Sequence, residues 1–354
     1  MKKQKIKAAF FILTVLFFIF AGCTIITLEM YSQAFGRIDG MIEGEFTTYF
    51  TWSEIDQNRY SREEVRFNSH GNRLQGFIYG RSNNKGLVII SHGLGGSADH
   101  YLPMIKFFVD NGWRVFAYNN TGTAGSEGEG VRGLTQSVID LDSALTFVSN
   151  SQMFAGLPVM LVGHSWGGFA VCAVLNFDHN VNAVVSFAGF NNSREIFTEV
   201  GAALIGGVFY TLRPQLWAIE RQLFGNKTRL TAVDGINRSG IPVMIVQTDD
   251  DDIVPHDTTS IFAHRHRITN PNVVIVFREG EDATGHEFPF GSIAQRDYMR
   301  TARASWEAFS AKIENVTNAD FAQWAKEFNF DKSRANELDP ALMRRINTFF
   351  INSK

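Results

Sequence analysis

Three residues of types that act together in nucleophilic catalysis follow apolar segments along this chain. Ser165 comes directly after the apolar run 159–162 and is the central residue of a Gly-x-Ser-x-Gly motif. Asp251 and His286 each follow a later apolar run. A serine hydroxyl is a weak nucleophile at neutral pH until a base takes its proton, and a carboxylate can orient that base. The combination of serine, acid and histidine therefore predicts acyl transfer through a covalent intermediate.

The pattern around Ser165 predicts a strand that runs straight into a helix. Such a turn is sharp and exposes the side chain at its apex. Gly163 and Gly167 would leave room for neighbouring backbones to close around the turn. The N–H group of Trp166 would then point at the oxygen that becomes negative during acyl transfer. A Gly-x-Ser-x-Gly pattern alone is also compatible with a structural turn, so the interpretation depends on the rest of the chain.

Apolar runs alternate with helical patterns along most of the sequence. Glu64–Phe67 and Leu74–Tyr79 predict two antiparallel strands joined by a turn at Gly71-Asn72. Continuous apolar runs, typical of strands buried on both faces, follow at 86–91, 113–118, 159–162, 181–187, 241–246 and 272–277. This alternation predicts an α/β fold with a mostly parallel central sheet and helices on both faces.

The same pattern suggests how the chain is divided. Residues 191–238 interrupt the alternation with an apolar helical insertion, which is interpreted either as a cap over a pocket or as ordinary core helix. A separate helix is expected at about 256–266. The predicted parts are an N-terminal signal or anchor segment (1–28), a tether (29–61), the catalytic domain with its cap insertion (62–315), and a helical extension without an assigned function (316–354).

The N-terminus has the layout of an export signal. Lys2, Lys3, Lys5 and Lys7 precede the uncharged run 8–22. The sequence Phe-Ala-Gly-Cys that ends at Cys23 resembles the cleavage box of bacterial lipoproteins, with Phe in place of the more usual Leu, so Cys23 is a candidate for lipidation. The apolar run continues to Leu28 and is long enough to span a bilayer. A lipoprotein, an uncleaved anchor and a secreted product remain open, and each places the bulk of the protein outside the cytoplasm.

Composition narrows the class of protein. The chain has 354 residues, 45% hydrophobic and 19% charged, which fits a globular protein with a sizeable core. The net charge of −3 and the lack of a basic stripe make nucleic acid an unexpected partner. Cys172 is the only cysteine besides Cys23, which fits an oxidising compartment. The expected chemistry needs no metal and no organic cofactor, and the sequence does not indicate an oligomeric state.

Further motifs make the chain similar to the α/β-hydrolase superfamily over residues 62–315. The His92-Gly93 turn resembles the oxyanion loop of that superfamily, which implies the Leu94 N–H as the second oxyanion donor beside Trp166. The loop Asn119–Gly128 resembles the pattern Asp-x-Arg-Gly-x-Gly-x-Ser-x-Gly, from which it departs at three positions, including Asn119 in place of Asp. The nearest subgroup comprises the serine aminopeptidase S33 and monoacylglycerol-lipase-like hydrolases.

The resemblance also selects the acid and the base. In the family pattern the acid lies four residues before the Pro of a Val-Pro pair, so Val254-Pro255 selects Asp251. The neighbours Asp249, Asp250 and Asp252 remain alternatives, and a calcium loop is disfavoured because its alternating ligand spacing is absent. His286 follows the last predicted strand beside Gly285, as the base of the family does. His92 and His164 are expected to be structural.

These observations favour a membrane-tethered serine hydrolase of the cell envelope. The expected substrate is a small-molecule or lipid ester, and the apolar stretch 202–219 together with the N-terminal segment favours lipid or acylglycerol esters. A peptidase that uses the same three residues is the alternative. A surface-binding lipoprotein with an inactive hydrolase scaffold is a third possibility, from a different functional class.

Overall fold

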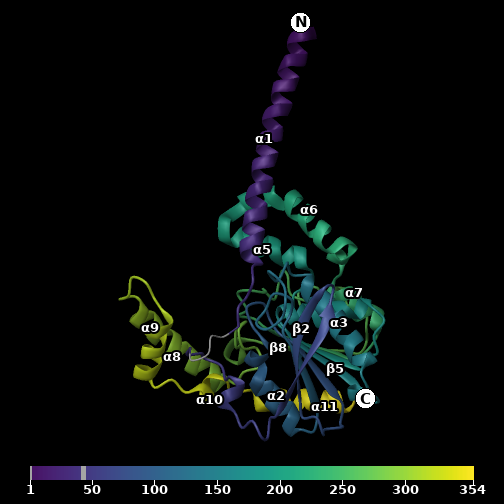
Figure 1. The fold of residues 1–354 in the computed structure, drawn as a ribbon, viewed down its shortest axis with the longest axis vertical. Helices are drawn as coiled ribbons and strands as arrows, with labels where there is room; N and C mark the ends of the chain where they lie inside the picture. The colour runs from purple at the N-terminus through teal and green to yellow at the C-terminus, as the bar shows by residue number, and fades with distance from the viewer. Residues whose placement is uncertain (1, 41–44) are drawn as a thin grey trace.

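A single mixed sheet forms the centre of the protein in a computed structural model that describes residues 2–40 and 45–354 (Figure 1). Within these residues it has eight strands, in the spatial order β1-β2-β4-β3-β5-β6-β7-β8. Strand β2 is antiparallel to β1 and β4, and β4, β3 and β5–β8 are parallel. The strands are β1 Arg62–Ser69, β2 Asn72–Tyr79, β3 Leu87–Ser91, β4 Arg114–Tyr118, β5 Val159–His164, β6 Ala183–Phe187, β7 Val243–Thr248 and β8 Val273–Arg278. The predicted α/β fold with a mostly parallel sheet is confirmed.

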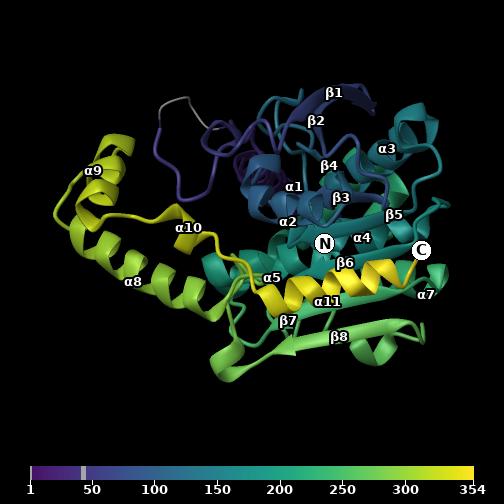
Figure 2. The same ribbon diagram turned by 90° about the horizontal axis from the view of Figure 1, so that it is seen from below.

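Helices cover both faces of the sheet. One face carries α3 Gln136–Asn150, α4 Trp166–Ala173 and α7 Ala232–Ser239, and the other carries α2 Leu102–Asp110 and α11 Pro340–Ile351 (Figure 2). Side chains of β3 alternate between the two cores, with Leu87 and Ile89 in the first and Val88 and Ile90 in the second. All four are buried. An uninterrupted apolar run is therefore what a strand in this position requires.

The C-terminal segment completes the second face of the sheet. Met343, Ile346 and Phe350 of α11 are fully buried against it, and the Trp113 indole donates to Asn347 Oδ1 over 2.8 Å. Before α11, the helices α8 Ile293–Ser310, α9 Asn318–Phe328 and α10 Lys332–Ala335 form a lobe at one side of the body (Figures 1 and 2). The sequence indicated no role for this extension. In the structure, α11 covers the second face of the sheet.

A long helix precedes the sheet. Helix α1, Lys2–Ala34, leaves the body as a continuous rod that contains Cys23 (Figure 1). Its segment Phe10–Ala34 has a mean hydropathy of 2.6 and is long enough to cross a membrane. The expected tether 29–61 is not a free linker at its start, because Tyr31 and Phe35 are buried in the hydrophobic core.

The insertion between β6 and β7 is helical. It contains α5 Ser193–Ile205, η5 Gly206–Leu212, α6 Arg213–Phe224 and η6 Gly225–Arg229, followed by α7. Helix α1 contacts α6 and η5 where it leaves the body. We call the segment 193–229 the cap. Short 3₁₀ turns elsewhere are η1 Trp52–Glu54, η2 Ala98–Tyr101, η3 Gln152–Phe154, η4 Val174–Asn176, η7 Arg265–Arg267 and η8 Gly280–Asp282.

Two local predictions were wrong. Residues 256–266 form turns and η7 rather than an α-helix, because the Asn191 N–H donates to the Thr259 carbonyl and Phe190 pairs with Ser260 in an isolated bridge. The Thr259 carbonyl and the backbone of Ser260 thus bond to the chain after β6 and are not free for hydrogen bonds within a helix. The first hairpin turns at His70-Gly71, both at positive φ (45° and 96°), one residue earlier than expected. Two positive φ values suit a two-residue hairpin turn.

Candidate active site

Ser165 lies at a strained turn between β5 and α4. Its backbone has φ 54° and ψ −112°, a region that non-glycine residues rarely adopt. A Cβ atom on Gly163 would lie 2.1 Å from the Gly167 carbonyl oxygen, and one on Gly167 would lie 2.0 Å from the Ser91 carbonyl oxygen. Only glycine fits at both positions, so the two glycines permit the turn that presents the Ser165 hydroxyl.

The structure brings Ser165, His286 and Asp251 together across 121 residues of sequence. Ser165 Oγ lies 2.9 Å from His286 Nε2. His286 Nδ1 lies 2.9 Å and 3.0 Å from the two carboxylate oxygens of Asp251. Both His286 and Asp251 are buried, with 7% and 4% of their surface exposed. This is the geometry in which a base takes the proton of a hydroxyl while a carboxylate holds the imidazole tautomer.

The Asp251 carboxylate is fixed by backbone and side-chain donors. Its Oδ1 accepts from the N–H groups of Ile253 and Val254, over 3.1 Å and 2.7 Å. Its Oδ2 accepts from Gln247 Nε2 over 3.0 Å. A carboxylate with this many partners cannot rotate freely, so His286 meets an acceptor of defined orientation.

The other aspartates of this loop point elsewhere. Asp249 Oδ2 accepts from the Gly280 N–H, and Asp250 Oδ1 accepts from the Gly285 N–H, each over 2.8 Å. Asp252 is exposed. Asp249 and Asp250 therefore fasten the loops after β7 and β8 to each other, and Asp251 alone of the four contacts His286 among the described residues.

Two backbone N–H groups beside Ser165 are available for an oxyanion. Leu94 and Trp166 line the same cavity as Ser165. Among the described residues, neither N–H group donates to a protein acceptor. Trp166 is the first residue of α4. The N–H groups in the first turn of a helix have no acceptor within that helix. Leu94 and Trp166 are the donors predicted from the sequence, and their role stays a prediction.

A hydrogen-bond chain that the sequence did not reveal links the Leu94 loop to His286. The Gly93 N–H donates to the Tyr101 hydroxyl over 2.9 Å, and that hydroxyl lies 2.9 Å from His164 Nδ1. His164 Nε2 lies 2.8 Å from the carbonyl oxygen of His286, so Nε2 carries a proton. Burial lowers the pKa of His164 to about 3, so the ring is neutral and Nδ1 accepts from Tyr101. No sequence spacing marks Tyr101 as a partner of His164.

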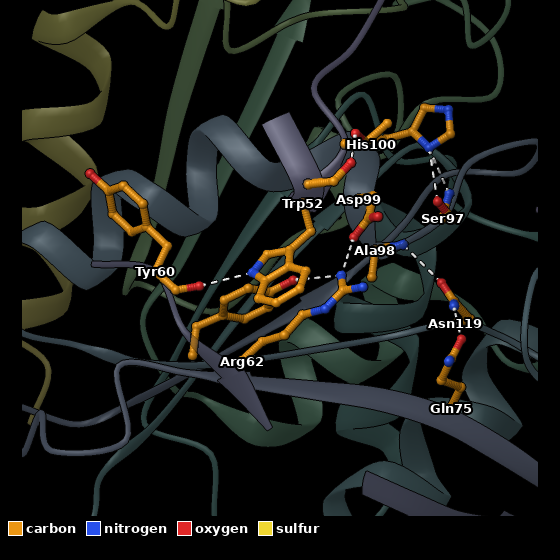
Figure 3. Close-up of polar contacts among 12 residues, drawn as sticks. Trp52, Tyr60, Arg62, Gln75, Ser97, Ala98, Asp99, His100 and Asn119 are labelled. Carbon is orange, nitrogen blue, oxygen red and sulfur yellow. Dashed lines mark hydrogen bonds and ion pairs between the residues drawn. The ribbon is translucent and has the colours of Figure 1, made fainter. Parts of the chain in front are cut away.

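Further contacts hold the loop that carries Leu94. The Ala98 N–H donates to Asn119 Oδ1 over 2.9 Å, and Asn119 Nδ2 donates to Gln75 Oε1 over 3.0 Å (Figure 3). Asn119, which replaces the Asp of the family pattern, thus caps η2 through its side-chain amide oxygen. His92 is structural, as expected: its Nε2 accepts from the Asn120 N–H, and burial lowers its pKa to about 4.

Arg62 binds the same loop from the side of β1. Its guanidinium forms an ion pair of 2.8 Å with Asp99 and lies between the rings of Trp52 and Phe77, 4.5 Å and 4.1 Å from their centroids (Figure 3). The Trp52 indole in turn donates to the Tyr60 carbonyl over 3.0 Å. Part of the expected tether therefore supports the loop after β3.

A cavity of about 770 Å³ lies above Ser165 and His286. Its lining is predominantly apolar toward α1 and the cap, where Phe35, Ile196 and Phe197 contribute. Polar side chains contribute from residues 48–49 and from α8 and the turn after α10, including Tyr49, Arg303 and Asn336. Such a cavity can hold a ligand that has both apolar and polar groups.

Part of the chain is similar in sequence to known hydrolases. A family model described as serine aminopeptidase, S33 matches residues 82–235. The chain is similar to the human monoglyceride lipase, with 33% identity over 84 residues, which are 24% of this chain and 28% of the lipase.

Solved structures share the fold. An esterase of Pyrococcus furiosus superposes with a TM-score of 0.52 and 16% identity, over 82% of this chain and 98% of that one. Acetyl xylan esterase 1 of Thermoanaerobacterium sp. superposes with a TM-score of 0.50 and 18% identity, over 66% of this chain and 80% of that one. At such identities the likeness establishes the fold alone.

The fold defines the class: the chain has the α/β-hydrolase fold, as the motifs predicted. The central part of the chain is similar to the serine aminopeptidase S33 family and to a monoglyceride lipase.

Proposed function

We propose that this protein is a membrane-tethered serine hydrolase that cleaves carboxylic esters through an acyl-enzyme on Ser165. The observation that carries the proposal is the pair of hydrogen bonds from Ser165 Oγ to His286 and from His286 to Asp251, at the floor of the cavity. The three residues come from loops at the carboxyl ends of β5, β7 and β8, where α/β sheets bind ligands.

The geometry supports the following sequence of steps. Ser165 Oγ attacks the ester carbonyl carbon while His286 Nε2 takes the hydroxyl proton, and the N–H groups of Leu94 and Trp166 bind the resulting oxyanion. The bond to the alcohol oxygen then breaks, and His286 returns the proton to the leaving alcohol. Water repeats the attack on the acyl-enzyme and releases the acid. Asp251 stabilises the imidazolium in both halves. Loss of one oxyanion donor costs about 3–4 kcal/mol in a comparable site.

The cavity supports an ester with an apolar acyl group and a polar alcohol. Phe35 and Phe197 offer an apolar wall, whereas Tyr49 and Arg303 offer polar groups on the side of the lobe α8–α10. The apolar span of α1 supports a membrane tether. The similarity to a monoglyceride lipase fits an acylglycerol or another lipid ester as substrate.

A chain-length series tests this proposal. Purified full-length protein and Ser165→Ala are assayed with p-nitrophenyl esters of two to sixteen acyl carbons and with aminoacyl p-nitroanilides. We expect ester turnover that prefers medium or long chains and is abolished in Ser165→Ala. Turnover of the anilides but not of the esters would make the protein a peptidase, and equal turnover by both forms would overturn the role of Ser165.

A further inference from the structure

The lower end of α1 forms part of the wall of the catalytic cavity. Ala34 and Phe35 line the cavity. The ring of Phe35 stacks on that of Phe197 of α5, with centroids 5.3 Å apart, and Tyr31 contacts both rings. The helix that carries the apolar span is therefore a structural part of the site rather than a distant anchor.

The chain just after α1 fixes the direction in which the helix leaves the body. The Arg37 guanidinium donates to the carbonyl oxygens of Ala124, Ser126 and Gly128. Gly36 pairs with Gly130, and Ile38 pairs with Thr123, in short β-bridges. With these contacts on one side and buried Tyr31 and Phe35 on the other, α1 cannot swivel freely about its junction with the body.

The tip of the cap beside α1 exposes a concentrated apolar surface. Five of the ten large apolar side chains that the described part of the chain exposes after residue 35 lie between residues 200 and 210. We call them the cap tip: Val200, Leu204, Ile205, Val208 and Tyr210, of which Leu204 is 78% exposed. The remaining five are scattered between residues 94 and 351. Exposed apolar side chains concentrated in one segment suggest an interaction surface.

The position of α1 identifies what covers the cap tip. Figure 1 shows α5 and α6 beside α1 where that helix leaves the body, and α1 contacts both η5 and α6. A bilayer around the exposed apolar side chains of α1, which run from Phe10 to Leu28, would therefore reach the surface on which these residues lie. Arg213 adds a cation beside the rings of Tyr210 and Trp217, 5.9 Å and 4.7 Å from their centroids. Aromatic and basic side chains are typical of the membrane–water boundary.

We propose that α1 and the cap tip form one surface seated in the membrane, and that the catalytic cavity opens onto the bilayer between them. The inference rests on the proposed ester hydrolysis and specifies its substrate: a membrane-resident long-chain ester that enters from the lipid without crossing water. Val200 connects the cavity with the proposed membrane surface, because it lines the cavity and also belongs to the exposed cap tip. The acyl chain then lies along Phe35 and Phe197, and its carbonyl reaches Ser165.

Two substrates of different solubility test this inference. The full chain is reconstituted into phosphatidylcholine vesicles that contain a fluorogenic long-chain acylglycerol, and the same preparation is assayed with soluble p-nitrophenyl acetate. In the double variant Leu204→Glu/Val208→Glu we expect at least a tenfold loss on the vesicle substrate and less than a twofold change on the soluble ester. Neither residue lines the cavity.

A matched control places the same substitutions at exposed apolar residues far from the cap. Val316→Glu/Ile351→Glu, at side chains 49% and 42% exposed, should leave both rates unchanged. An unchanged vesicle rate in the cap-tip variant, or equal losses on both substrates, would overturn the membrane-seated cap. Absence of turnover on both substrates by the wild type would instead overturn the proposed function.

An independent measurement does not depend on activity. An environment-sensitive fluorophore is attached at Leu204→Cys in a Cys23→Ser background, where the remaining Cys172 is fully buried. We expect blue-shifted emission that brominated phosphatidylcholine quenches. Emission typical of water, without quenching, would show that the cap tip does not enter the membrane and would overturn the inference.

Discussion

Removing the hydroxyl of Tyr101 tests whether the chain from Gly93 to His286 positions the site. Tyr101 is 5% exposed, and its hydroxyl both accepts from the Gly93 N–H and donates to His164 Nδ1. Tyr101→Phe keeps the ring and leaves these two buried groups without a partner. Burial raises the pKa of Tyr101, so the phenol is protonated and can donate at any pH of interest.

The expected magnitude follows from those two groups. A buried donor or acceptor that loses its partner costs about 1–3 kcal/mol, so we expect Tyr101→Phe, which leaves two such groups, to lose about 2–6 kcal/mol of unfolding free energy. Gly93 precedes Leu94, whose N–H is the proposed oxyanion donor. A small displacement of Leu94 should lower kcat about tenfold, or about 1.4 kcal/mol, with little change in KM. Complete loss of a donor would cost about 10²–10³.

Urea unfolding and steady-state kinetics on a soluble ester measure both effects. Tyr118→Phe is the matched control, because Tyr118 is also fully buried but its hydroxyl makes one long contact of 3.4 Å, to Ser91 Oγ. If Tyr101→Phe is no less stable than Tyr118→Phe and keeps the wild-type kcat, the chain does not position the site and the reasoning is refuted.

Two further predictions concern acidic side chains. Asp251→Asn should lower kcat by about 10⁴, the loss found in a comparable triad, whereas Asp252→Asn should leave it within twofold; equal losses in kinetic assays would contradict the choice of Asp251. Burial raises the pKa of Glu220, which is 1% exposed, to about 7. Between pH 4.5 and 7 the unfolded chain releases a proton that the folded chain keeps, so stability falls by about 3 kcal/mol as pH rises. Glu220→Gln should remove this slope in urea titrations at several pH values, and an unchanged slope would show that Glu220 does not cause it.

Local rules explain why three residues selected from the sequence lie together in the structure. A buried strand, two glycines that tolerate no Cβ and a following helix force the turn at Ser165. The carboxyl ends of parallel strands meet at one edge of the sheet, so the loops with Asp251 and His286 had to lie near it. Strand alternation likewise predicted the sheet, because burial on both faces requires continuous apolar runs.

Long-range packing explains what the sequence did not reveal. Tyr101 and His164 are 63 residues apart, and no periodicity connects them. Residues 29–61 were expected to form a tether, because this stretch is polar and aromatic without clear periodicity, yet Tyr31 and Phe35 pack in the core. Residues 256–266 were expected to form a helix, but they form turns and pair with the chain after β6.

Covalent labelling of Ser165 tests most directly whether its hydroxyl is an activated nucleophile. Folded full-length protein and Ser165→Ala are treated with a fluorophosphonate probe, which reacts with activated serine hydroxyls, and the modified peptide is mapped by mass spectrometry. We expect one labelled site, at Ser165, which is lost in the variant. An unlabelled folded wild type, or a label that persists in Ser165→Ala, would contradict the central claim that His286 and Asp251 activate Ser165.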